Sequence, residues 1–536
     1  KGTIDTLSFK EGAKAVHWEC DGGTEYDMSD GTAATPGTTI TLYLNEDSYE
    51  FANEYKAREV VEKYCSFMPV PIFLTNEDAG EQTEEIPEEE VTDKDTVLDT
   101  FIKEAVTEEV EKEDGTKETV EKVPAKKMAK IVKRPVAIND IHPLWTKHPN
   151  ECTEDEYKEF YRKVFNDYKE PLFWIHLNMD YPFNLKGILY FPKINTEYES
   201  IEGTIKLYNN QVFVADNIKE VIPEFLLLLK GVIDCPDLPL NVSRSALQND
   251  GFVKKISDYI TKKVADKLSG MCKTNRENYE KYWDDINPFI KFGCLKDEKF
   301  AEKMNDYIIF KNLEGKYLTL KDYLEANKEK HENTVFYVTD EKEQSQYINM
   351  FKKEGLDAVI LSHNIDSPFI TQMEQKNEHI KFQRIDADLT DHFKEDVSEE
   401  EKEAFKEKTD SLVEIFRKAL GNDKLEVKVE KMKDENVASM ITLSEESRRM
   451  QEMMKMYGMA GMGMDPAMFG GKGETLVLNA NNNLVKYVLD NPDGENTPTI
   501  CCQLYDLAVL ANRPLSADAM TKFVARSNEI LSILAK

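Results

Sequence analysis

The sequence predicts a multidomain α/β protein. A chain of 536 residues is too long to fold around a single hydrophobic core. Two regions, 138–255 and 301–395, alternate helical and strand patterns in the way that α/β units do. A strongly charged stretch at 76–137 separates them from a strand-rich first segment at 1–75. The remaining region, 396–536, ends in two apolar helical patterns, so we expect several folded parts and one acidic linker.

Composition narrows the class of protein. The formal net charge is -32, and charged residues make up 32% of the chain. This acidity argues against non-specific binding to nucleic acid, which requires clustered Lys and Arg. No apolar run approaches the ~20 residues that span a bilayer, so no membrane segment is predicted. The chain starts at Lys1 without an initiator Met, and we expect it to begin inside a longer protein.

Cysteine usage gives no sign of a metal site or of disulfides. The eight cysteines are scattered, and none belongs to a CxxC pair. The eight histidines do not cluster with them. The spacing therefore predicts no metal ligands and eight free thiols, as in a reducing cytosol.

The first segment reads as strands followed by one helix. Residues 15–20 and 24–28 flank a Gly-containing turn and predict a hairpin. Residues 37–44 alternate with period two and predict a further strand. A helix is expected over 55–67 and a closing strand over 70–74. We expect these few elements to be the C-terminal part of a domain whose N-terminal part precedes Lys1.

The charged stretch at 76–137 is expected to be a flexible linker. Residues 77–93 hold nine acidic side chains and no basic one, and Lys becomes frequent after residue 125. Such a composition buries too little apolar surface to offset the entropy of ordering. Repulsion between like charges should also extend the linker. A weak helix is expected at most over 96–110.

The region 138–255 is expected to form the larger α/β unit of a middle domain. Thr153 and Glu156 have the spacing of a capping box, which predicts a helix start. Gly231 is expected to end a buried helix with a left-handed cap. The expected helices cover 157–168, 224–230 and 253–268, and the expected strands cover 187–192, 205–208 and 212–214.

A helical connector at 256–300 and a smaller α/β unit at 301–395 should complete this middle domain. The order of strand 334–338, helix 344–353 and strand 358–361 predicts a parallel βαβ unit. The last two helices are expected at 499–512 and 517–534.

One segment carries candidate chemistry, residues 237–248, with the sequence DLPLNVSRSALQ. The chain has no GxxxxGK[ST] and no GxGxxG between a strand and a helix. In this segment Ser243 or Asn241 can cap a following helix, on which Arg244 and Gln248 project from one face. A guanidinium and an amide together suit a phosphate oxygen and its attacking water. A purely structural Arg244, paired with a local carboxylate such as Asp237, is the alternative.

The same segment resembles the middle-domain signature of the ninety-kilodalton heat-shock family, in its bacterial form. In that family a Gly-Val-Val-Asp strand leads into Leu-Pro-Leu-Asn-Val-Ser-Arg, with Gln four residues after the arginine. Similar motifs occur in order over nearly the whole chain, outside the linker: 18–26, 145–147, 155–161, 205–208, 212–213 and 320–324.

The resemblance implies a fold and an activity. The fold would be the end of a GHKL-type α/β ATPase domain, an acidic linker, an α/β middle domain with two α/β/α units, and a mostly α C-terminal dimerisation domain. Arg244 would be the catalytic arginine, supported by Gln248 and Asn241. Phe213 would pack beneath that loop, although an ordinary core role fits equally well. Thr38 would lie near the adenine.

The resemblance also implies a cofactor, ATP with Mg, for the intact protein. Most of the nucleotide pocket would precede Lys1, so we expect no ATPase activity from this chain alone and no cofactor bound to it. Two positions depart from the family pattern beside the arginine loop: Ser245 stands where Glu is usual, and Gln211 where a basic residue is usual.

Partners follow from the C-terminal region. Met450, Met453 and Met454 belong to a methionine-rich stretch that suits varied apolar clients, although a disordered loop explains it equally well. The final helix has more apolar surface than one helix needs, which predicts a homodimer through the C-terminal helices. The chain ends without the acidic tail that recruits TPR co-chaperones and without a retention signal, so a cytoplasmic bacterial protein is expected.

Two functions remain open from the sequence. The first is an ATP-driven chaperone that remodels unfolded or partly folded clients. The second is an ATP-independent holdase or scaffold in which the arginine loop is only structural. A topoisomerase-like or mismatch-repair ATPase is a remote third, disfavoured by the acidic composition.

Overall fold

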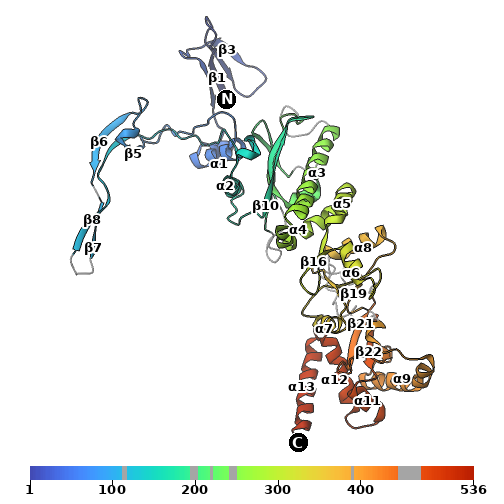
Figure 1. Cartoon of the computed structure of the whole chain (residues 1–536). Helices are drawn as coiled ribbons and strands as arrows, with labels where there is room; N and C mark the ends of the chain where they lie inside the picture. Colours follow the sequence, from blue (N-terminus) through green and yellow to red (C-terminus); the bar gives the residue numbers. More distant parts are fainter. Residues whose placement is uncertain are drawn as a thin grey trace. The chain divides into compact units, whose positions relative to one another are not determined.

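The computed structural model describes residues 1–104, 106–111, 117–193, 203–217, 221–240, 250–387, 391–444, 449 and 473–535 (Figure 1). The chain forms two compact units. The first contains Lys1–Tyr190, Thr204–Ile218 and Lys230–Phe252, and the second contains the rest. No helix in the described part of the chain is long and apolar enough to cross a membrane.

An antiparallel sheet of four strands opens the first unit. Its strands are β1 (Gly2–Leu7), β2 (Val16–Cys20), β3 (Asp27–Asp30) and β4 (Gly37–Leu42), in the order β3-β2-β1-β4. The hairpin and strand predicted for this segment are confirmed. Helix α1 (Glu54–Cys65) follows, with the side chain of Asn53 accepting a hydrogen bond from Tyr55 N.

The closing strand predicted at 70–74 is wrong. These residues form no strand, and their backbone bonds to the side chain of Asn139. Asn139 Oδ1 accepts from Ile72 N at 2.7 Å, and its Nδ2 donates to Met68 O and Val70 O. Ile138 N also donates to Ile72 O at 2.8 Å, so the two ends of the charged stretch meet.

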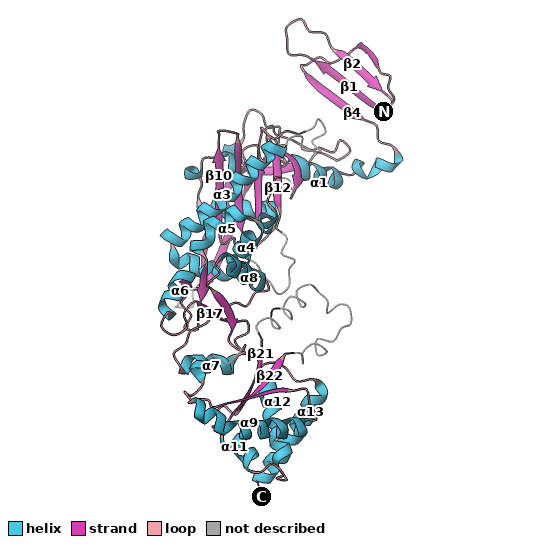
Figure 2. Cartoon of the chain, turned by 90° about the vertical axis from the view of Figure 1, so that its right-hand side faces the viewer, coloured by secondary structure: helices cyan, strands magenta, loops and turns pink. Residues whose placement is uncertain are grey.

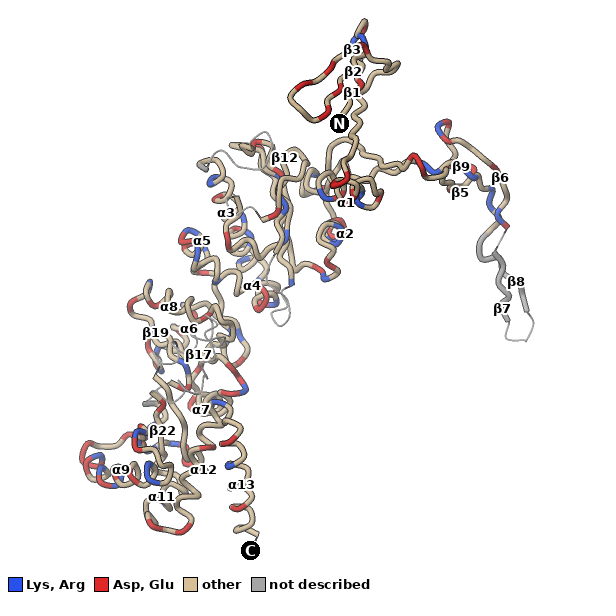
Figure 3. Tube along the Cα trace, turned by 180° about the vertical axis from the view of Figure 1, so that it is seen from behind, with Lys and Arg blue, Asp and Glu red and all other residues tan. Residues whose placement is uncertain are grey.

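The charged stretch is more ordered than its composition predicts. Strands β5 (Thr83–Pro87), β9 (Lys126–Val132) and β6 (Val97–Lys103) form an antiparallel sheet in that order. A hairpin of β7 (Val106–Glu111) and β8 (Lys117–Val123) extends from it. The weak helix expected at 96–110 is therefore wrong, since these residues lie in strands. Both signs of charge lie along the sheet (Figure 3).

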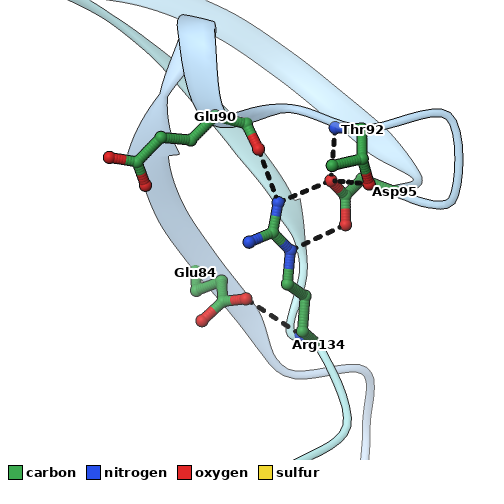
Figure 4. Close-up of polar contacts among 5 residues, drawn as sticks. All are labelled: Glu84, Glu90, Thr92, Asp95 and Arg134. Atoms are coloured by element: carbon green, nitrogen blue, oxygen red, sulfur yellow. Dashed lines mark hydrogen bonds and ion pairs between the residues drawn. The ribbon is translucent and has the colours of Figure 1, made fainter.

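Arg134 explains how so acidic a segment folds. Its Nε and Nη2 bind the two oxygens of Asp95 at 2.8 and 2.6 Å, and Nη2 also donates to Glu90 O (Figure 4). Its backbone N donates to Glu84 Oε1 at 2.9 Å. The guanidinium holds the pKa of the Asp95 carboxyl well below its usual range. Ala129 and Ile131 on β9 are fully buried, and the prediction that the stretch as a whole is a flexible linker stays a prediction.

The larger α/β unit contains the predicted strands as β11, β12 and β13, together with β10 and β14, which were not predicted. Thr153 and Glu156 form the expected capping box at the start of α2 (Glu154–Phe165). The sheet has the order β10-β11-β14-β12-β13. Its strands are β10 (Phe173–Met179), β11 (Leu185–Phe191), β14 (Lys230–Asp234), β12 (Ile205–Asn209) and β13 (Val212–Asp216). Strand β14 pairs antiparallel with β11 and parallel with β12, and β12 pairs antiparallel with β13.

The helix predicted at 224–230 with its cap at Gly231 is wrong. Residues Glu224–Leu228 form a short 3-10 helix, and Gly231 lies inside β14. A Cβ atom at Gly231 would lie 2.7 Å from Ile188 O. Glycine is therefore required here by the close approach of β11 and not by a left-handed helix end.

The second unit is helical in its first part (Figure 2). Helices α3 (Asp250–Thr274), α4 (Arg276–Lys296) and α5 (Glu298–Met304) match the predicted connector. The smaller α/β unit follows, and its sheet β18-β17-β19 is parallel throughout, which confirms the βαβ prediction. Its elements are β15 (Ile309–Lys311), β16 (Tyr317–Thr319), α6 (Leu320–Asn327), β17 (Thr334–Val338), α7 (Ser345–Lys353), β18 (Val359–Ile360), α8 (Asp366–Lys376) and β19 (Lys381–Arg384).

The C-terminal region combines a small sheet with helices. Strands β20 (Glu426–Glu430), β22 (Glu474–Asn479) and β21 (Ser439–Leu443) pack beside α9 (Glu399–Leu420) and α12 (Thr497–Leu510). Helices α11 (Asn483–Asp490) and α13 (Ala517–Leu534) complete it. The two predicted terminal helices are confirmed. Met432, Met440 and Val477 share one core with Phe336 and Phe351, so this core spans the expected domain boundary at residue 395.

Candidate functional site

The predicted arginine loop begins in a part of the first unit where strand ends and turns converge. Phe213, on β13, is buried there. Its ring lies 5.8 Å from that of Tyr64 on α1 and 5.7 Å from that of Tyr208 on β12, both edge to face. Lys206 Nζ lies 5.7 Å from the centre of the Phe213 ring. Phe213 is thus a core residue, and its role beneath the arginine loop stays a prediction.

Phe67 and Trp145 form the centre of this core. Their ring centroids are 4.7 Å apart, and both rings also contact Tyr208 and Phe160. Phe67 lies just after α1, while Trp145 lies just before α2. Residues on both sides of the charged stretch therefore share one aromatic core.

Gln211 occupies a strained turn between β12 and β13. Asn210 and Gln211 both have positive φ, 50° and 63°, as a two-residue hairpin turn of this hand requires. Gln is unusual in this conformation, and three hydrogen bonds hold it. Its backbone N donates to Asp234 Oδ2 at 3.0 Å. Its Nε2 donates to Phe67 O at 2.7 Å and to Ile141 O at 3.3 Å.

Asp234 connects this turn to the start of the arginine loop. It ends β14, and its Oδ2 also accepts from Trp145 Nε1 at 3.2 Å. Burial raises the pKa of this carboxyl. Asn209 Nδ2 donates to Cys235 O and Pro236 O, which fixes the backbone that leaves β14.

Asp237 also holds the base of the arginine loop, and its pairing with Arg244 stays a prediction because Arg244 lies outside the described residues. Its Oδ2 accepts a hydrogen bond from Asn184 N at 2.7 Å. Leu238, the next residue, is buried. The base of the arginine loop is therefore held to the sheet by contacts from the β10–β11 and β12–β13 connections.

Most predicted site residues lie outside the described residues. These are Asn241, Arg244, Ser245 and Gln248 in the loop, and Met450, Met453 and Met454 in the methionine-rich stretch. Their predicted roles are neither supported nor opposed by the structure.

Thr38 is described, and it is separate from the residues above. It lies exposed on β4, opposite Thr6, with the two Oγ1 atoms 2.8 Å apart. One exposed strand position bonded to its neighbour does not make a nucleotide pocket. The described residues do not by themselves fit ATP.

Sequence reasoning missed the residues that hold the loop base. Asp234 and Trp145 appeared only as parts of motifs, and Asn209 belonged to none. Gln211 was noted as a departure from a family pattern. The turn Asn210-Gln211 between two strands was the available signal, because such turns demand positive φ and thus external support.

Gln211→Ala is expected to lower the free energy of unfolding by about 1–2 kcal/mol, because two part-buried backbone carbonyls lose their donor. Chemical denaturation of the purified chain measures this. Asn210→Ala is the matched control, since among the described residues that side chain donates to Asn209 Oδ1 alone, within the turn. Equal losses in the two variants would mean that the bonds to Phe67 and Ile141 contribute nothing.

The C-terminal helix α13 presents a second candidate surface. None of its residues is buried. Met520, Val524, Leu531 and Leu534 recur at helical spacing, and the last three are 50%, 62% and 78% exposed. Arg526 attaches α13 to α12, through an ion pair with Asp506 and a 2.9 Å bond from its Nε to Gln503 Oε1. An apolar stripe on a firmly attached helix indicates an interaction surface.

Comparison with known proteins places the chain in a family. The family model described as Hsp90 protein matches residues 50–535. The chain belongs to the Hsp90 family of molecular chaperones. Within that family it is similar to the bacterial heat-shock chaperone HtpG.

Three bacterial HtpG proteins show the extent of the similarity. Chaperone protein htpG of Bacteroides fragilis (strain YCH46) is 38% identical over 511 residues, which cover 93% of this chain and 68% of that protein. HtpG of Porphyromonas gingivalis (strain ATCC 33277) is 35% identical over 507 residues, 93% of this chain and 67% of that protein. HtpG of Pseudoalteromonas translucida is 28% identical over 535 residues, 97% of this chain and 76% of that protein.

Proposed function

We propose that this chain supplies the arginine-loop arm, the client surface and the dimer contact of an ATP-driven chaperone clamp. The observation that carries the proposal is the anchored base of the loop. Asn209, Asp234 and Asp237 fix residues 234–238 through side-chain bonds to three different chain segments. Such anchoring suits a loop that must present a side chain accurately to a partner.

Arg244 distinguishes the clamp from an ATP-independent holdase. In a chain extended to the full length of its relatives, Arg244→Ala is expected to lower ATP turnover about 100-fold or more. Nucleotide affinity should stay nearly unchanged, because the residue acts on the reaction and not on the adenine. Steady-state turnover and equilibrium nucleotide binding measure the two quantities.

Arg162→Ala is the control for this experiment, since Arg162 is an exposed arginine on α2. Unchanged turnover in Arg244→Ala, with client aggregation still suppressed, would favour the holdase. Equal losses of affinity and turnover would favour a folding role for Arg244.

The stripe on α13 supports homodimerisation through the C-terminal helices. Val524→Asp with Leu531→Asp is expected to convert a dimer to a monomer, because two charges would enter the apolar contact. Sedimentation equilibrium measures the mass. Ala525→Asp with Ser532→Asp is the matched control, with the same charges and spacing about a quarter turn away. A dimer that persists in the first variant would show that another surface makes the contact.

A further inference from the structure

A cavity in the second unit has no part in the function proposed above. It has a volume of about 290 Å³ and lies between α4 and the strands of the smaller α/β unit. Trp283, Asn287 and Lys291 recur every four residues on α4 and therefore share one face of that helix. Helix α8, which supplies Asp366, packs against α4.

The cavity lies where α/β sheets commonly bind ligands. Glu341 lines it three residues after the end of β17, and Leu361–His363 line it directly after β18. These two strands are parallel, so both segments leave the same edge of the sheet. The crevice beyond the carboxyl ends of parallel strands is the usual ligand position in such sheets.

Lys291 offers unused donors to this cavity. Its side chain is only 3% exposed, and its ammonium group bonds to Asp366 Oδ1. The other oxygen of Asp366 accepts from His363 N at 2.9 Å. An ammonium group has three N–H donors, and Asp366 is its one hydrogen-bond acceptor among the described residues. A carboxylate in the cavity would receive the remaining donors.

Asn287 offers the complementary group. Its Nδ2 donates to Trp283 O and to Asp284 O, the carbonyl that loses its helical partner because Pro288 has no N–H. Its Oδ1 is buried without a hydrogen-bond partner in the described part of the chain. Such an orphaned acceptor is costly unless a donor reaches it.

The charges of the wall are mixed. Asp284, Glu341 and Asp366 line the cavity, and so do Lys291 and Lys311. Burial lowers the pKa of His363, which favours its neutral form. A purely anionic ligand would meet the carboxylates, and a purely cationic one would meet the lysines. A ligand that carries both a negative and a positive charge can pair with the lysines and with the carboxylates.

The remaining wall is apolar and includes Ile309, Phe310, Ile360 and Leu361. We propose that this cavity binds a small zwitterion with an apolar body, such as an amino acid with an apolar side chain. Its carboxylate bonds to Lys291, and its ammonium group meets Asn287 Oδ1 and the neighbouring carboxylates. The proposal is independent of the arginine loop and of the dimer contact.

The first test uses L-phenylalanine as the probe and the purified full chain labelled with 13C at isoleucine methyl groups. Titration should shift the Ile309 and Ile360 methyl signals and saturate at about millimolar concentration or below. The Ile441 methyl, in β21, should not move. L-Phenylalaninamide lacks the carboxylate, and 3-phenylpropionate lacks the ammonium group. Each should bind at least about tenfold more weakly, as the loss of one charged hydrogen bond predicts.

The second test removes the buried charges together. Lys291→Met with Asp366→Asn neutralises both partners and keeps the side-chain volumes, and it should weaken L-phenylalanine binding by about tenfold or more. Lys299→Met, an exposed lysine, is the control. Absence of a saturable shift in the unmodified chain would overturn the proposal. So would equal binding of L-phenylalanine and either analogue, or unchanged binding in a folded double variant.

Discussion

Trp145→Ala is expected to lower the free energy of unfolding of the first unit by about 3–5 kcal/mol. Trp145 is fully buried, and its ring contacts Phe67, Phe160 and Tyr208. Truncation would leave a cavity at the centre of this core and remove the Nε1 donor from Asp234. Chemical denaturation followed by near-ultraviolet circular dichroism measures the loss.

Two further variants separate the causes of this loss. Trp145→Phe keeps most of the packing but removes the bond to Asp234, and should cost about 1–2 kcal/mol. Trp18→Ala is the matched control, because Trp18 is only partly buried on β2 and packs mainly against Tyr26. It should cost clearly less than Trp145→Ala. Similar losses at both tryptophans would mean that the aromatic core does not stabilise the first unit.

Lys291→Met is expected to destabilise the second unit by about 3–5 kcal/mol, because it leaves Asp366 as an unpaired buried carboxylate. Both side chains of this pair are less than 5% exposed. Differential scanning calorimetry of the full chain should show a lower transition temperature for this unit. Lys353→Met is the control, since Lys353 pairs with Asp434 at an exposed position.

A double variant tests this explanation directly. Adding Asp366→Asn to Lys291→Met should recover much of the lost stability, because no buried charge then lacks a partner. If the double variant is as unstable as the single one, packing around Lys291 accounts for the loss and the ion pair does not.

Local sequence signals predicted much of the fold. The capping box at Thr153, the hairpin at 15–28 and the parallel βαβ unit at 334–361 depend on residues close together in the chain. Their physical causes can be found within a short window. These elements were placed correctly because no distant residue was needed to form them.

Distant contacts account for what the sequence did not reveal. Residues 83–132 have a composition typical of disorder, but β5 and β6 pair with β9 in a sheet, and Arg134 binds Asp95 across 39 positions. Gly231 was predicted to end a helix. The actual reason for glycine at this position is the close approach of Ile188 on β11, 43 residues earlier, which no local pattern indicates.

The candidate site also depends on contacts between residues that are distant in the sequence. The motif at 237–248 was found by its resemblance to a family signature. The residues that hold the base of its loop were not found in this way. Gln211 bonds to carbonyls 144 and 70 residues away, and no local pattern indicates either partner.

The pairing of Ile72 with Ile138 changes how the acidic insertion should be understood mechanically. Thr83 also lies opposite Val132, so the insertion leaves and re-enters the fold at nearly the same place. A linker that joins two separate parts transmits tension between them. The charged stretch, whose two ends pair with each other, transmits none. Lengthening this stretch at its β7–β8 tip would therefore add no slack between the parts that flank it.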